Sequence, residues 1–149
     1  MKSAAKALKK SAWVFPFFSG SCNNCNIEIL DCLTPRFDLE RFGVLLVGNA
    51  RHADAILVAG VLNKKGVPRL KRIYQQVPKP CLVIAVGACA LSQGIFSGSY
   101  AISELPVDRV VPVDIYIPGC PPKPEAIMAG LLKALENSGT KVPRTVRKK

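Results

Sequence analysis

The longest apolar run of the sequence is Cys81-Leu82-Val83-Ile84-Ala85-Val86-Gly87-Ala88-Cys89-Ala90-Leu91. Its centre, Leu82–Val86, has the length of a strand that is buried on both faces, and a glycine follows it directly. The run is well short of the roughly 18 to 20 apolar residues that cross a bilayer, so it predicts no membrane span. A strand buried on both faces is typical of a parallel sheet, which sets the expectation for the rest of the chain.

Further apolar runs of strand length are bounded by turn residues, and segments with helical periodicity lie between them. The other predicted strands are Trp13–Phe18, Val44–Val47, Ala55–Ala59 and Val110–Ile117. Apolar residues at three- and four-residue spacing predict helices over Asn24–Leu33, Pro68–Val77 and Lys123–Asn137, the last with Gly139 as its end. Alternating strands and helices predict a single α/β domain with a mainly parallel, flavodoxin-like sheet that is flanked by helices.

The net charge of +11 lies mostly at the two ends of the 149-residue chain. Nine of the 21 Lys and Arg residues fall within residues 1–10 and 141–149, so 12 basic residues face 10 acidic ones in between. We therefore expect a basic N-terminal tail (1–10), one α/β domain (11–140) and a basic C-terminal tail (141–149). No zinc-finger, helix-turn-helix or RNA-binding aromatic pattern accompanies the charge, which argues against a nucleic-acid binder. Basic tails fit a chain that lies along acidic partners or anionic lipid.

Four of the six cysteines follow predicted strands. Cys22 and Cys25 come after the first strand, Cys89 after the fourth and Cys120 after the fifth. Because the carboxyl ends of parallel strands lie at one edge of a sheet, we expect the fold to bring these four thiols together. Four thiolates suit a 4Fe-4S cluster or a structural zinc ion, and one Cys-x-x-Cys pair completed by two separate cysteines, the last followed by proline, favours the cluster.

Two further interpretations of the cysteines stay open at this point. Cys22 and Cys25 could form a redox-active dithiol, although this would leave Cys89 and Cys120 without a role. The four could also be buried structural thiols that bind no metal. Cys32 and Cys81, within a helix and at a strand start, are predicted to be core residues. The first residues lack the pattern of a signal peptide, and a reducing cytosolic setting would keep all six cysteines reduced.

The motifs around these cysteines resemble those of the small, cluster-carrying subunit of energy-converting (group 4) NiFe hydrogenases, a relative of the complex I subunit that holds the terminal cluster. Hydrogenase-type members separate the first two ligands by two residues, as Cys22 and Cys25 are separated here, whereas complex I members place them side by side. The resemblance spans about residues 11–137, and its motifs are Gly20–Ile29, Leu33–Gly43, Arg51–Asp54, Gly87–Cys89 and Pro112–Pro122.

The resemblance implies one 4Fe-4S cluster bound by Cys22, Cys25, Cys89 and Cys120, and no complete active site in this chain. It implies electron transfer from ferredoxin-type clusters to a NiFe site in a hydrogenase-type large subunit, where proton reduction to H2 is coupled to ion translocation. The other implied partners are a ferredoxin-like cluster subunit and membrane-arm subunits, on the cytoplasmic side of the cell membrane. The alternatives are a related complex without nickel, of the sulfane reductase or complex I type, and a zinc-stabilised interaction module.

Several other residues have expected roles at the same edge. Glu28 lies three residues after Cys25, so a helix places both on one face, and the resemblance implies that Glu28 lies on a proton route. The alternative is a carboxylate stabilised by the helix dipole.

Gly20, Gly87 and Gly119 are expected to let the backbone approach the cluster and to present N–H groups to its sulfurs. Arg51 and His52 follow the second strand, from which they could reach this edge too; the alternatives are an ion pair of Arg51 with Asp54, a contact with a partner, and a structural role for His52.

Overall fold

Five parallel strands make up the central sheet, in the order β2-β1-β3-β4-β5. This is the strand order of flavodoxin-like sheets, so the predicted fold is confirmed. The computed structural model describes residues 11–137; the two predicted tails, and Gly139 as the end of the last helix, lie outside the described residues. The strands are β1 (Ala12–Phe18), β2 (Val44–Leu46), β3 (Ala55–Ala59), β4 (Leu82–Val86) and β5 (Ile115–Ile117).

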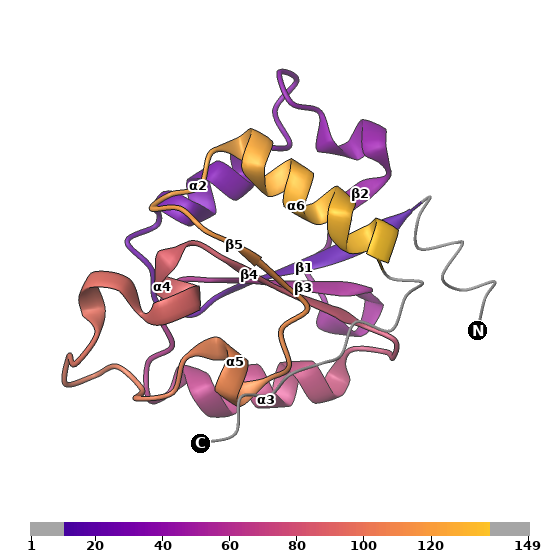
Figure 1. Ribbon diagram of the computed structural model, residues 1–149. Helices are drawn as coiled ribbons and strands as arrows, with labels where there is room; N and C mark the ends of the chain where they lie inside the picture. Colours follow the sequence, from indigo (N-terminus) through magenta and orange to yellow (C-terminus); the bar gives the residue numbers. More distant parts are fainter. Residues whose placement is uncertain (1–10, 138–149) are drawn as a thin grey trace.

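Helices cover both faces of this sheet (Figure 1). Helices α2 (Asn24–Asp31) and α6 (Pro124–Asn137) lie on one face, and α3 (Gly66–Gln76) and the short α5 (Val107–Val110) lie on the other. Helix α4 (Ala88–Ser92) lies at the carboxyl ends of the strands. Three 3-10 turns, η1 (Leu39–Phe42), η2 (Ala50–His52) and η3 (Gly94–Phe96), complete the connections. Among the helices of residues 11–137, none has the length and apolar character that a bilayer span requires.

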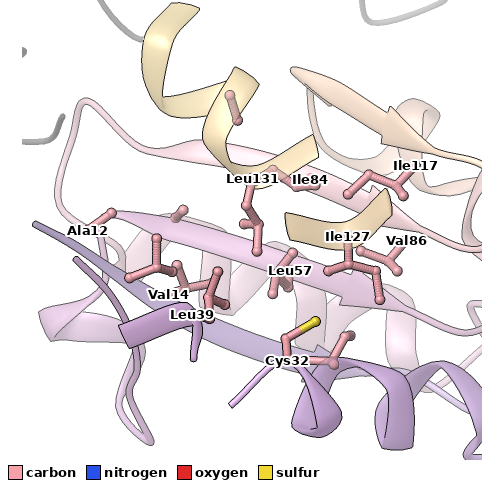
Figure 2. Packing of buried hydrophobic residues seen from close by; sticks show 14 of the residues in the cluster. Ala12, Val14, Cys32, Leu39, Leu57, Ile84, Val86, Ile117, Ile127 and Leu131 are labelled. Atoms are coloured by element: carbon pink, nitrogen blue, oxygen red, sulfur yellow. The ribbon is translucent and has the colours of Figure 1, made fainter. Parts of the chain in front are cut away.

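The core has two halves because alternate side chains of each strand point to opposite faces of the sheet. On the α2 and α6 face, Val14, Leu57 and Ile84 pack against Ile127 and Leu131 (Figure 2). On the α3 and α5 face, the second cluster is formed by the other side of the same strands. Its buried members include Phe17, Ile56, Val58, Leu70, Val83 and Val107. All five residues of β3 are buried, which explains their unbroken apolar sequence.

The fifth strand is shorter than predicted. The apolar run from Val110 predicts eight strand residues, but pairing with β4 begins at Ile115, opposite Ile84. Val110 belongs to the short helix α5, and Pro112, which has no N–H to donate to a sheet ladder, lies between this helix and the paired residues. Asp114 lies at the start of the pairing: its N–H donates to the Val83 oxygen (2.8 Å), and its Oδ2 accepts from the Val83 N–H (2.8 Å).

Candidate metal centre

The loop after β1 crosses the end of β3 and carries the first two cysteines toward β4. The Ser19 N–H donates to the Ala59 oxygen (3.1 Å), and the Val61 N–H donates to the Gly20 oxygen (3.2 Å). Gly60 makes the crossing possible, because its φ is +87° and a Cβ there would lie 2.8 Å from the Ser21 Cβ. Cys22 therefore lies beyond the β3 end, and Cys25 falls in the first turn of α2.

The loops after β4 and β5 run side by side past the ends of their strands. The Gly87 N–H donates to the Ile117 oxygen (2.8 Å), and the Ala88 N–H donates to the Gly119 oxygen (2.8 Å). These two bonds hold the Cys89 segment beside the Cys120 segment. They also overturn one prediction: the Gly87 N–H is bonded to β5 and is not presented to a cluster sulfur.

Gly87 has a different role, which is to make room for a thiol. A Cβ built on residue 87 would lie 2.7 Å from Cys25 Sγ, and the φ of Gly87 is +85°, where side chains are rarely accepted. The bare backbone at the end of β4 thus lets the α2 cysteine approach it closely. Through this contact the loops after β1 and β4 meet at one point of the carboxyl edge.

The four predicted cysteines influence one another electrostatically. Burial, with smaller effects of Cys89, Cys22 and Cys120, raises the pKa of the Cys25 thiol from 9.0 to about 11. The pKa of Cys89 is also raised, first by burial and then by Cys120 and Cys22. Cys25 is buried, Cys89 half-buried, and Cys22 and Cys120 are exposed. The raised pKa values favour the protonated thiol at Cys25 and Cys89, and a metal bound there would have to displace these two protons.

The spacing of the thiols bears on which metal they would fit. Within residues 11–137, no three His, Cys, Asp or Glu side chains converge as the ligands of a single metal ion would. A zinc ion draws four sulfurs onto one centre, whereas a 4Fe-4S cube holds its four thiolates apart at its corners. Four thiol donors, two from one Cys-x-x-Cys pair and two from later segments, form the donor set that suits a 4Fe-4S cluster.

A polar network not foreseen from the sequence supports the turn between Cys22 and Cys25. Asn23 has a left-handed conformation (φ 69°), and its N–H donates to Ser21 Oγ (3.1 Å). Asn26 joins them: its amide donates to Asn23 Oδ1 (3.3 Å), and its Oδ1 accepts from the Ser21 hydroxyl (3.2 Å). The sequence signal for this network is the group of small polar residues around the Cys-x-x-Cys pair, because Ser and Asn side chains commonly hydrogen-bond to the backbone within turns.

Glu28 lies on α2, one turn after Cys25, and its side chain is half-buried. Its backbone oxygen accepts from the Cys32 N–H (3.3 Å) and from Cys32 Sγ (3.2 Å). Its carboxylate shares the surface of α2 with the exposed apolar side chains of Ile27 and Leu30. Cys32 and Cys81 are fully buried, which confirms them as core residues.

Arg51 and His52 do not reach the cysteine edge, so that prediction is wrong. β2 pairs only with Ala12–Val14, the first half of β1, and β3 starts level with Val14. The turn η2, which holds both residues, therefore lies about four strand residues, or roughly 13 Å, short of the carboxyl edge. Both side chains are exposed there.

Comparison with known proteins identifies the family of the chain. Residues 22–134 match the family described as the NADH ubiquinone oxidoreductase 20 Kd subunit. The chain belongs to this family. It is 51% identical over 131 residues to the probable membrane-bound hydrogenase subunit mbhJ of Pyrococcus furiosus, covering 88% of this chain and 78% of the relative. It is 43% identical over 133 residues to an NADH-quinone oxidoreductase subunit of Geotalea uraniireducens, covering 89% of this chain and 75% of that one.

Another relative in the family is considerably longer than this chain. Formate hydrogenlyase subunit 7 of Escherichia coli is 44% identical over 133 residues, which are 89% of this chain but 52% of the relative. Among solved structures, a chain of the membrane-bound sulfane sulfur reductase, an archaeal respiratory membrane complex, superposes with a TM-score of 0.81. It is 35% identical, and the match covers 94% of this chain and 77% of that one. The family thus supplies subunits to several kinds of oxidoreductase complex.

Proposed function

We propose that this chain is the electron-transfer subunit of a membrane-bound hydrogenase complex and holds one 4Fe-4S cluster with Cys22, Cys25, Cys89 and Cys120. The observation that carries the proposal is the position of these four thiols: they follow β1, β4 and β5 at the carboxyl edge of the sheet, within electrostatic range of one another. A bound 4Fe-4S cluster takes up and releases one electron at a time. The electrons would come from ferredoxin-type clusters and pass to a NiFe site in the large subunit.

The residues of the chain have two tasks in this proposal. The four cysteines hold the cluster, and the close packing of Gly87 on Cys25 excludes water from the side of the sheet. Excluding water and fixing nearby backbone dipoles are the means by which a protein sets the potential of a bound cluster. The bonds from Gly87 to Ile117 and from Ala88 to Gly119 keep the two later cysteine loops at a fixed separation.

Two related functions fit the same site, and a specific observation supports each. The hydrogenase function is supported by 51% identity to the membrane-bound hydrogenase subunit and by the two-residue spacing of Cys22 and Cys25. A sulfane sulfur reductase without nickel is supported by the TM-score of 0.81. Assays of the intact complex for H2 evolution and for polysulfide reduction separate the two, because only the first requires nickel in the large subunit.

The proposal includes the place of the chain in its complex. It would contact the large subunit, a ferredoxin-like subunit and the membrane arm, as a peripheral subunit on the cytoplasmic side of the membrane. It also includes Glu28 as a proton carrier beside the cluster. The support for Glu28 is its position one turn from Cys25 on α2, with a side chain that is half-buried and thus open to a covering partner.

The cluster is tested on the complete chain, produced anaerobically together with its partner subunits. We expect brown protein with about four iron atoms per chain and broad absorbance at about 400 nm. Single Cys-to-Ser variants at the four ligand positions should lose iron, whereas Cys32→Ser and Cys81→Ser should keep it. Colourless protein with one zinc ion per chain would contradict the proposal and favour the interaction module.

A further inference from the structure

Basic residues without acidic neighbours gather on and around helix α3. Between Asp54 and Glu104 the sequence has no Asp or Glu at all. The same segment contains six basic residues, and all of them are exposed. They form what we call the basic α3 face: Lys64, Lys65, Arg69, Lys71, Arg72 and Lys79.

Helical geometry places three of these six charges on the outer side of α3. Leu70 is fully buried, and Val67, Ile73 and Tyr74 pack partly against the same core, so this side of the helix faces the sheet. Arg69 and Arg72, three residues apart, and Lys71 next to them lie on the opposite side. The helix has 11 residues and is about 16 Å long, so the face is large enough to meet a protein surface.

Within residues 11–137, no ion pair neutralises this face. The ion pair between Arg41 and Asp38 (3.6 Å) lies elsewhere, next to η1. Two of the six cations lie over aromatic rings instead: Lys64 Nζ is 5.2 Å from the ring centre of Tyr100, and Lys79 Nζ is 3.9 Å from that of Tyr74. Such contacts orient a side chain but leave its positive charge in place.

The opposite side of the molecule has a different charge pattern. Helices α2 and α6 carry both signs: Glu28 and Asp31 on the first, and Glu125, Lys133 and Glu136 on the second. Within residues 11–137, the layer that contains α3 therefore carries a run of cations with no acidic residue between Asp54 and Glu104, whereas the layer of α2 and α6 on the other face of the sheet carries both signs. Asymmetry of this kind orients an approaching partner of opposite charge.

We propose that the basic α3 face binds an acidic surface of another protein subunit of the same complex. A protein partner fits better than a lipid surface, because the exposed large apolar side chains of residues 11–137 lie outside residues 64–79, with Tyr100 beside Lys64 at the margin of the face. Helices that lie in a membrane interface present such side chains to the acyl boundary. The partner would also lie next to the cysteine edge, since Asn63, just before Lys64, donates its side-chain amide to the Ser19 oxygen (3.3 Å).

The first experiment locates the partner in the assembled complex. A zero-length carbodiimide reagent joins lysine amines to carboxylates that touch them, and mass spectrometry identifies the joined peptides. We expect Lys64, Lys65, Lys71 and Lys79 to be joined to Asp and Glu residues of one subunit. Because an amine must touch its carboxylate to react, joined peptides from none of these lysines would overturn the proposal.

The second experiment reverses charge on the face. When the complex is purified through this chain, the triple variant R69E/K71E/R72E should retain less than about a tenth of the subunit identified by cross-linking. The comparison is made at a salt concentration where the wild type retains that subunit fully, since electrostatic contacts are weakened by salt. The matched control R36E/R41E/K133E reverses three exposed charges near η1 and on α6, and should retain the subunit as the wild type does. Equal retention by the triple variant and the wild type would overturn the proposal.

A lipid arm completes the test. Vesicles of phosphatidylcholine and phosphatidylglycerol are sedimented with the full chain and with the triple variant. If the wild type binds the vesicles, the triple variant does not, and the triple variant still assembles into the complex, the face binds lipid and our proposal is overturned. The proposal rests on the proposed function only in taking the partner from the same complex. Iron content distinguishes failure of the proposed function from failure of this proposal. A wild-type chain without iron would contradict the proposed cluster. A triple variant that has normal iron and assembles normally would contradict the docking face alone.

Discussion

Gly87 lies directly against the sulfur of Cys25: a Cβ at residue 87 would be 2.7 Å from Cys25 Sγ. The two residues are far apart in sequence and belong to different elements of the fold. Their contact joins the end of β4 to the first turn of α2, and thereby sets the distance between the Cys22–Cys25 pair and the other two thiols. The absence of a side chain at residue 87 thus affects the arrangement of the four thiols.

Gly87→Ala should disturb the metal centre by pushing the Cys25 thiol away. We expect iron content of the assembled chain to fall by more than half, measured per chain after anaerobic purification. The variant also has a backbone cost of about 1–3 kcal/mol, because a side chain is strained at positive φ. Gly98→Ala is the matched control, since Gly98 has φ +79° but open space where its Cβ would lie. Equal iron loss in both variants would mean that strain, and not the contact with Cys25, is responsible.

Glu28→Gln should slow turnover of the intact complex while leaving its cluster in place. Proton transfer by a positioned carboxylate contributes about 10²–10⁴-fold, so we expect a loss of at least about a hundredfold with unchanged iron content. Asp31→Asn is the control, because Asp31 is a second half-buried carboxylate of α2. The pH dependence of the rate is measured alongside, since a purely structural role of Glu28 would not change it. Full activity of Glu28→Gln would remove the proton role.

The strands and the edge of the sheet that carries the cysteines could be predicted because short stretches of sequence determine both. Unbroken apolar runs of five residues indicate buried parallel strands, and parallel strands place Cys89 and Cys120 at the same edge. The location of Arg51 and His52 could not be predicted, because no local pattern shows that β2 pairs with only half of β1. The N–H of Gly87 was likewise assigned wrongly, since its bond to Ile117 depends on the register between β4 and β5.

Asp54 should stabilise the fold by extending the ladder between β1 and β3. Its N–H donates to the Trp13 oxygen (2.7 Å), and its Oδ2 accepts from the Trp13 N–H (3.0 Å). Asp54→Ala removes the side-chain acceptor, and we expect the free energy of unfolding to fall by about 1–2 kcal/mol in denaturant titration. Asp54→Asn keeps an acceptor and should recover much of the loss. Glu40→Ala, which removes an exposed carboxylate, should change stability by less than about 0.5 kcal/mol.

Cys32 should make the fold sensitive to alkaline pH. The thiol is fully buried beneath Ile127 (Figure 2), and its Sγ contacts the backbone oxygens of Glu28 (3.2 Å) and Pro124 (3.6 Å). Burial, with a smaller effect of Asp31, raises its pKa from 9.0 to about 11. Folding therefore favours the neutral thiol: its contribution to stability is complete below pH 9 and is lost as pH rises from about 9 to 11.

The test compares the wild type with Cys32→Ala between pH 8 and about 11, because the difference between them removes the effect of every other titrating group. At pH 8 the variant should be less stable by about 1 kcal/mol, the cost of emptying a small buried volume. With rising pH the wild type should lose up to about 3 kcal/mol more than the variant, as two pKa units correspond to that amount. A stability difference that stays constant over this range would show that the Cys32 thiol is not held neutral by the fold.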